Sequence, residues 1–203
     1  MYISKIALIN FKGFKGEHIL NFDKGLNFFV GDNNCGKSSI FEAVEFVRTK
    51  RLREEVITKT ATDKEIVSVE MEFKGDDLQL LIETEPLKKY QSYLIDTNGE
   101  KSLRVMRSSQ ENKILQDKKP KELSISNVRV FNPSTNQFEN PTGADNTITA
   151  LFDAQFVWAD SNSSEVTDFL KQKFVEKSST LLLKILLILV LGRISQGFMK
   201  KPL

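Results

Sequence analysis

The stretch GDNNCGKSS, at residues 31–39, holds the residue types and spacing best suited to chemistry. Gly31, Gly36, Lys37 and Ser38 satisfy the phosphate-binding pattern of a glycine, four variable residues, a second glycine, a lysine and a serine or threonine. In such a loop, backbone N–H groups converge on the phosphates, the lysine contacts the β and γ oxygens, and the hydroxyl binds Mg²⁺. The stretch therefore predicts a site for ATP and Mg²⁺.

Each position of this stretch has an expected role. The predicted nucleotide contacts are Gly31, Asn33, Asn34, Cys35, Gly36, Lys37, Ser38 and Ser39. Ser38 is also a predicted metal ligand, whereas the catalytic residues are unknown. Cys35 occupies a variable position, where a small side chain is tolerated, and a thiol near a helix N-terminus can be activated. We expect alkylation of Cys35 to block nucleotide binding sterically.

The elements that must position this loop can be read on either side of it. Residues 26–30 form an apolar run that stops at Gly31, which predicts a buried strand. A helix is predicted from Lys37 to about Lys50 or Arg53. Its apolar face consists of Ile40, Phe41, Val44 and Val47. A strand that enters the loop and a helix that leaves it are the context the motif requires, and a chance glycine turn is the alternative.

Most of the remaining chain predicts strands. Alternating apolar residues indicate strands at residues 2–11, 18–22, 67–73, 78–82, 125–131 and 156–158. Asn98 and Gly99 predict a tight hairpin turn between residues 93–95 and 103–106. Residues 132–147 are rich in Pro, Asn, Thr and Gly and predict a long surface loop.

Helical spacing returns near the C-terminus, at residues 162–174 and 179–195. The predicted fold class is therefore mixed α/β (α+β) in a single, partial domain. We expect strands, the phosphate-binding loop and the first helix in residues 1–53, a β-rich lobe in 54–160, and helices in 161–203.

Bulk composition excludes several classes of protein. The 203 residues carry 29 Lys and Arg against 27 Asp and Glu, so a net charge of +2 gives no strong attraction to nucleic acid or anionic lipid. A single cysteine and the absence of a secretory signal favour the cytoplasm. The apolar run at 181–191 contains Lys184 and is shorter than the roughly 17 to 25 residues that span a bilayer. No membrane segment is expected.

Two stretches resemble a known group of proteins. ISKIALINFKGFKG at 3–16 and LNFFVGDNNCGKSSIFEAVEF at 26–46 resemble the N-terminus of ABC-type DNA-repair and defence ATPases. Many such heads carry glycine where this chain has Asn34, and the pair Asn33 and Asn34 is similar to the OLD (overcoming lysogenization defect) family of ATP-dependent endonucleases. RecF and SMC proteins are relatives of this family. The resemblance implies a P-loop ABC-type head that forms a homodimer.

The resemblance also implies roles for two residues outside the loop. Lys12 would reach the nucleotide phosphates, although a solvated loop lysine is an equally simple interpretation. Gln155 would correspond to the glutamine that senses Mg²⁺ and the attacking water, although a plain strand residue is the safer interpretation. His18, the single histidine, has no Cys or carboxylate cluster at metal-ligand spacing and is expected to be structural or exposed.

Parts that hydrolysis and DNA cleavage would need are not found in the sequence. FVWAD at 156–160 comes nearest to a Walker B motif, but Asp160 is followed by Ser161 and not by Glu. A Ser-Gly-Gly signature and an acidic Toprim nuclease block are absent as well. The chain is therefore expected to be the N-terminal part of a longer polypeptide, which binds ATP with little or no hydrolysis. Self-association through residues 179–195 is also expected.

Three functions fit these features, and a transporter ATPase is a further possibility that the long β-rich insertion makes less favoured. The first is the ATP-binding segment of an OLD-like endonuclease, in which ATP-driven dimerisation regulates DNA cleavage by a module outside this chain. The alternative is a RecF- or SMC-like DNA-repair ATPase without a nuclease. A P-loop small-molecule kinase is the least favoured, because no arginine-bearing lid is evident. Direct DNA contact through Lys118, Lys119 and Lys121 stays open, since so short a basic run is usually a solvated turn.

Overall fold

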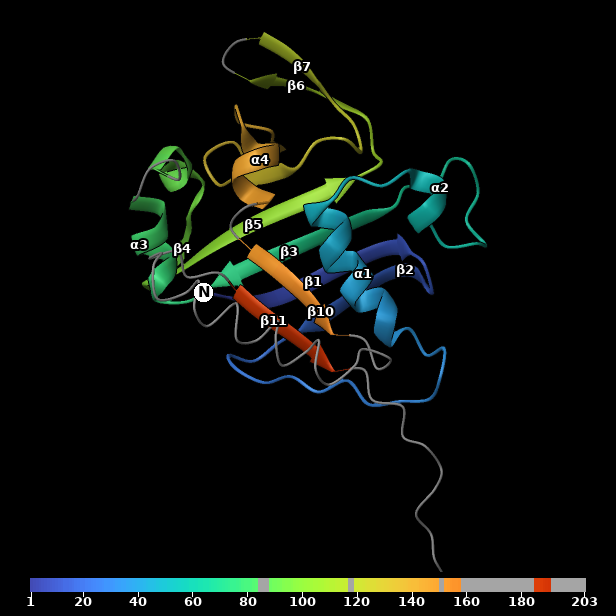
Figure 1. Ribbon diagram of the computed structural model, residues 1–203. Coiled ribbons are helices and arrows are strands. Elements are labelled where there is room, and N and C mark those ends of the chain that lie inside the picture. The colour runs from blue at the N-terminus through green and yellow to red at the C-terminus, as the bar shows by residue number, and fades with distance from the viewer. Residues whose placement is uncertain (84–87, 117–118, 150–151, 158–184, 191–203) are drawn as a thin grey trace, which may run out of the picture. The chain divides into compact units, whose positions relative to one another are not determined.

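The computed structural model describes residues 1–83, 88–116, 119–149, 152–157 and 185–190, with the backbone alone for the last two ranges (Figure 1). Contacts between residues divide the chain into two units, Met1–Phe152 and Asp153–Leu203. The phosphate-binding loop belongs to the first unit, which holds most of the described elements.

A seven-stranded sheet is the centre of the first unit. Its order is β2-β1-β3-β5-β8-β9, with β4 paired to β5, and neighbouring strands are antiparallel. The strands are β1 (Tyr2–Phe11), β2 (Phe14–Asn21), β3 (Ser68–Lys74), β4 (Ile95–Thr97), β5 (Glu100–Ser108), β8 (Arg129–Asn132) and β9 (Gln137–Glu139).

Helix α1 (Lys37–Arg48) covers one face of this sheet, against β1, β3 and β5 (Figure 1). Its side chains Ile40, Phe41, Val44, Phe46 and Val47 are buried. The strands supply the other half of the core through Ile6, Leu8, Val69, Met71, Phe73, Leu103 and Val105, all of them buried. Because α1 begins at the phosphate-binding loop, packing of α1 on the sheet fixes where that loop lies.

Shorter elements surround the sheet. They are α2 (Arg53–Val56), α3 (Asp77–Glu83), a 3₁₀ helix at Lys88–Tyr93 and α4 (Ala144–Thr149). Strands β6 (Asn112–Gln116) and β7 (Lys119–Leu123) pair with each other as a hairpin that stands away from the sheet (Figure 1). Strands β10 (Phe152–Val157) and β11 (Ile185–Val190) form a separate two-stranded sheet.

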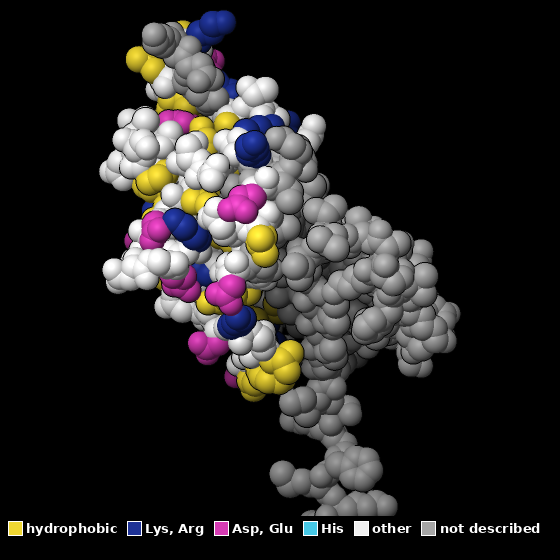
Figure 2. All heavy atoms as spheres, turned by 90° about the vertical axis from the view of Figure 1, so that its left-hand side faces the viewer, with side chains coloured by type: hydrophobic (Ala, Val, Ile, Leu, Met, Phe, Trp, Pro, Cys, Tyr) yellow, Lys and Arg dark blue, Asp and Glu magenta, His cyan; other side chains and the backbone are white. Residues whose placement is uncertain are grey.

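Surface charge and helix length agree with the composition. The face drawn in Figure 2 carries basic and acidic side chains interspersed, as the net charge of +2 implies. None of the helices in the described ranges is long and apolar enough to cross a bilayer.

Several sequence-based predictions are confirmed. The mixed helix and sheet class holds, and β1, β3 and α1 lie where the apolar pattern placed them. The β4–β5 hairpin turns at Asn98 and Gly99, whose φ angles of 55° and 84° are those that this dipeptide tolerates. Strands β2 and β8 each overlap their predicted ranges in part.

The predicted strand at residues 26–30 is wrong. Leu26, Phe28 and Val30 are 86%, 83% and 89% exposed, and no strand among the described residues pairs with this segment. Phe29 alone turns inward, with its ring 5.5 Å from the ring of Phe41. An apolar pattern cannot form a strand without neighbours for its backbone N–H and C=O groups.

Two more predictions are corrected in the β-rich lobe. Residues 78–82 lie in helix α3 and not in a strand. The prediction failed because so short an apolar run fits both the helical period of about 3.6 residues and the strand period of about 2. Residues 132–147 are not one long loop, since they contain β9 and most of α4. Hydrogen bonds organise this polar segment: Asn140 Nδ2 donates to Val128 O at 2.6 Å, and Val128 N donates to Asp145 Oδ1 at 2.7 Å.

The predicted C-terminal helix is wrong over Ile185–Val190, which form strand β11. The sequence ILLILV has no polar residue to set a period, and its Ile and Val residues favour strands. The predicted helix at residues 162–174 lies outside the described residues, as does the rest of 179–195. The β6–β7 hairpin was not predicted, because its strands are largely polar.

Candidate phosphate-binding loop

The loop between residues 30 and 37 bends at two left-handed positions. Asn34 has a φ of 65° and Gly36 a φ of 94°. Most L-residues lose about 1–2 kcal/mol in this conformation, but glycine avoids the cost and asparagine visits it more readily than most. The residue types at 34 and 36 therefore match the backbone that the bend requires.

Helix α1 begins directly after this bend and leaves its first amides free. Gly36 is the N-cap residue, and no side chain caps the helix. The first helical hydrogen bond runs from Ile40 N to Gly36 O at 3.3 Å. Within the described part of the chain, the amides of Lys37, Ser38 and Ser39 therefore lack an acceptor. Such amides at the positive end of a helix fit an anion.

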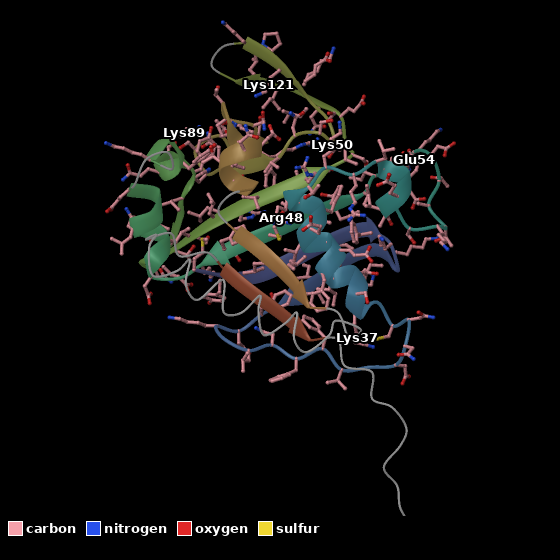
Figure 3. All side chains as sticks on the ribbon, in the orientation of Figure 1. Lys37, Arg48, Lys50, Glu54, Lys89 and Lys121 are labelled. Carbon is pink, nitrogen blue, oxygen red and sulfur yellow. The ribbon has the colours of Figure 1, made fainter. Side chains whose placement is uncertain are left out.

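Lys37 folds back over the loop. Its Nζ donates to the carbonyl oxygens of Gly31 at 2.7 Å and Asp32 at 2.6 Å, and it lies 3.4 Å from the Sγ of Cys35. Figure 3 shows Lys37 at the loop end of α1. Carbonyl oxygens carry only partial charge, so a phosphate oxygen would be a stronger partner for the same ammonium. The donor set of free amides and one ammonium fits a polyphosphate.

Cys35 is exposed, as are the loop residues 30–34 before it. A Cβ added to Gly31 would lie 2.9 Å from the Cys35 Sγ, which is too close for any other residue without a shift. Ser38 is exposed as well, so its hydroxyl is accessible to a hydrated metal ion. The predicted contacts at residues 31–39 are thus gathered in one short bend.

The turn between β1 and β2 lies against this loop. A Cβ added to Gly36 would meet the Phe14 ring at 3.1 Å, so that ring rests directly on the bend. Lys12 forms an ion pair with Glu42 of α1, and both side chains are about 30% exposed. Lys12 is therefore beside the helix and not loose in solvent, and its contact with phosphate stays a prediction.

Phe14 and Glu42 were not singled out from the sequence. Their contacts join residues more than twenty positions apart, which no local pattern reveals. The one sequence signal for these contacts was Phe14 itself, an aromatic residue that directly follows Lys12 and Gly13.

Two further residues from the sequence analysis, Gln155 and His18, lie in strands β10 and β2. Gln155 lies in β10, and its side chain is outside the described part of the chain. The imidazole Nε2 of His18 is 2.9 Å from the carbonyl oxygen of Lys15, at the surface. Over the described ranges, no group of three or more His, Cys, Asp or Glu side chains could hold a metal ion. A divalent ion at this site would depend on Ser38 and the nucleotide phosphates.

Comparison with known proteins finds an ATPase domain family and relatives that are named for DNA repair. Residues 1–186 match the AAA ATPase domain family. The chain is 44% identical over 79 residues to the DNA double-strand break repair Rad50 ATPase of Thermoplasma acidophilum, covering 36% of this chain and 8% of that protein. It is 30% identical over 137 residues to the DNA replication and repair protein RecF of Clostridium kluyveri, covering 66% of this chain and 33% of that protein.

A solved structure from work on the "structural biochemistry of ATP-driven dimerization and DNA stimulated activation of SMC ATPases" is also similar. The likeness has a TM-score of 0.45 at 17% identity and covers 88% of this chain and 96% of that chain. The chain spans between 4% and 33% of the length of the first curated relatives that it matches.

Proposed function

Because the chain belongs to the AAA ATPase domain family, we propose that it binds Mg²⁺-ATP at residues 31–39 and acts as the nucleotide-binding segment of a DNA-repair ATPase. The observation that carries this proposal is the bend at Asn34 and Gly36, after which the amides of residues 37–39 have no acceptor among the described residues and lie beside the Lys37 ammonium. The named relatives, a Rad50 ATPase and a RecF protein, support the assignment to DNA repair.

In this proposal, different residues of the chain contact different parts of Mg²⁺-ATP. The free amides hold the β-phosphate, and Lys37 exchanges the carbonyls of Gly31 and Asp32 for phosphate oxygens. Ser38 would ligate Mg²⁺ through its hydroxyl oxygen, and the bound ion would neutralise phosphate charge. Lys12 adds a second ammonium once it leaves Glu42. Gln155 is kept as a candidate metal contact.

Nucleotide-driven association is the second part of the proposal. The resemblance of residues 3–16 and 26–46 to ABC-type heads supports it, because such heads complete the γ-phosphate site with a second protomer. We therefore propose a homodimer of the complete protein, with DNA as its partner. Residues 179–195 stay a candidate for self-association.

An OLD-like endonuclease is the second candidate function. The pair Asn33 and Asn34, which is similar to OLD-type loops, supports it, and the left-handed φ of 65° at Asn34 is one that asparagine adopts more readily than most residues. The proposed nuclease would lie outside this chain. Cleavage of plasmid DNA by the complete protein, abolished by chelating the metal, would favour this candidate over the RecF- or SMC-like one.

Calorimetric titration tests nucleotide binding. Mg²⁺-ATP and Mg²⁺-ADP should bind the wild-type chain, and AMP should not, since the loop contacts the β-phosphate. Lys37→Ala should weaken ATP binding by about tenfold or more, equivalent to about 1.4 kcal/mol. Lys24→Ala is a matched control, because Lys24 is an exposed lysine paired with Asp76 on the surface. Equal affinity for all three nucleotides, or an unchanged Lys37→Ala variant, would contradict the proposal.

A further inference from the structure

Two arginines are buried on the sheet, at the end away from the phosphate-binding loop. Arg107 of β5 is 2% exposed and Arg129 of β8 is 0% exposed. Burial lowers the pKa of Arg129 to about 10, and it also lowers the pKa of Arg107, although Asp145 opposes that shift. Burying a guanidinium is costly, so the hydrogen bonds that these groups make should matter to the fold.

Arg107 joins the end of α1 to a loop. Its Nε and Nη2 donate to the carbonyl oxygen of Val47 at 3.2 Å and 3.1 Å. Its Nη1 donates to the carbonyl oxygens of Ile125 at 3.0 Å and Ser126 at 2.9 Å. Val47 belongs to the last turn of α1, where carbonyls have no helical partner and a cation is favourable. One side chain therefore holds two segments that are far apart in sequence.

Arg129 ties the same loop to the end of β5. Its Nη2 donates to the carbonyl oxygens of Ser108 at 3.2 Å, Ser124 at 3.5 Å, and Gln110. The β6–β7 hairpin leaves the body of the protein between Gln110 and Ser124. Both legs of that hairpin are thus held at their base by Arg129, and the second leg is joined through Arg107 to α1.

The base of the hairpin is anchored by its second strand: Leu123 is 1% exposed, and Lys121 Nζ donates to the carbonyl oxygen and to Oδ1 of Asn140 at 2.5 Å and 2.6 Å. The outer part is exposed, since Leu115 is 78% exposed and the Lys113–Glu122 ion pair lies on the surface. Figure 3 shows Lys37 and Lys121 at opposite ends of the structure, with α1 between them. Helix α1 is one continuous element, with the phosphate-binding loop before its first residue and Val47 in its last turn.

We propose that Arg107 is a positioning residue that transmits nucleotide occupancy at the phosphate-binding loop to the β6–β7 hairpin. The proposal rests on nucleotide binding at residues 31–39. When the loop closes on a polyphosphate, α1 shifts, and the Val47 carbonyl carries Arg107 and the loop at 125–126 with it. The hairpin then changes its exposure to solvent without touching the nucleotide.

Hydrogen–deuterium exchange with Mg²⁺-ATPγS tests the coupling. In the wild-type chain, nucleotide should change exchange of the hairpin amides at 112–116 and 119–123 by about fivefold or more, the lower end of typical coupling energies. Arg107→Lys keeps the charge but cannot reach the Val47 carbonyl and the carbonyls of Ile125 and Ser126 at once, so the hairpin response should be lost while nucleotide still binds. Arg104→Lys is the matched control, because Arg104 lies on the same strand but bonds Glu70 instead.

The outcomes separate the two proposals. If calorimetry shows no nucleotide binding, the proposed function fails. If nucleotide binds and the wild-type hairpin does not respond, or if Arg107→Lys responds in full, the coupling alone is overturned. If Arg107→Lys does not fold, the wild type decides: the amides at 47–49 and 125–127, next to the carbonyls that Arg107 joins, must respond together with the hairpin, and a hairpin response without them overturns the coupling.

Discussion

Strand β3 and the segment at 26–30 both hold several apolar residues, and only β3 is a strand. The sequence of β3 alternates apolar and polar residues, whereas 26–30 is an apolar run that was expected to be a buried strand. Strand β3 is paired with β1 on one side and β5 on the other, and Val69, Met71 and Phe73 are buried. The segment at 26–30 has no strand partner among the described residues. Apolar residues alone thus do not make a strand, because the backbone N–H and C=O groups also need strand neighbours.

The largest expected effect separates these two regions directly. Phe73→Ala should lower the free energy of unfolding by about 3–5 kcal/mol, because it leaves a cavity in the core. Phe28→Ala should change it by no more than about 0.5 kcal/mol, because the Phe28 side chain is exposed. Urea unfolding followed by circular dichroism measures both. Similar losses for the two variants would mean that the segment at 26–30 is buried in solution.

The bend at Gly36 should be the next most sensitive position. Gly36→Ala puts a Cβ on a residue with a φ of 94°, at 3.1 Å from the Phe14 ring. We expect a loss of about 1–2 kcal/mol in unfolding free energy, together with weaker ATP binding. Gly13→Ala is the control, since nothing lies within 4 Å of a Cβ there. Equal stability of the two variants would contradict the left-handed conformation of Gly36 and its contact with the Phe14 ring.

Modification of Cys35 should affect binding without affecting the sheet. The thiol is exposed, and its sulfur lies 3.4 Å from the Lys37 Nζ. A carboxamidomethyl group there should block Mg²⁺-ATP while urea unfolding changes by no more than about 0.5 kcal/mol. Cys35→Ser should resist the reagent and keep its affinity. Unchanged ATP affinity after complete labelling would refute the steric role of this position.

The smallest effect concerns the Lys12–Glu42 ion pair. Both side chains are partly exposed, so Glu42→Gln should cost at most about 1 kcal/mol of unfolding free energy. The same change frees Lys12, and a Lys12 that contacts phosphate should then bind ATP a few times more tightly. Calorimetry on Glu42→Gln and Lys12→Ala measures this. Identical ATP affinities in both variants and the wild type would leave Lys12 outside the binding site.

The sequence predicted the parts of the fold in which local pattern and tertiary contacts agree. Helix α1 and strand β3 each have one clean apolar period, and Asn98-Gly99 suits a single kind of turn. The bend at residues 31–38 was also predictable, because its residue types follow from the backbone it needs. What these segments share is that their own residues nearly determine their structure.

The remaining errors have physical causes outside the local sequence. Residues 26–30 depend on strands that only tertiary structure can supply. Residues 132–147 look like a loop because they are polar, but Asn140 and Asp145 use that polarity to hold Val128. The contacts of Phe14, Glu42 and Arg107 cross long stretches of sequence. Periodicity cannot reveal such contacts, and a single sequence carries no other signal for them.

The most direct test of the central claim is the amide spectrum of the ¹⁵N-labelled chain during titration with Mg²⁺-ATP. If the amides of Lys37, Ser38 and Ser39 bind the phosphates, their resonances should show the largest shifts, and Lys37→Ala should abolish those shifts. Saturating nucleotide that leaves these three resonances in place would contradict the account. So would shifts centred elsewhere in the first unit.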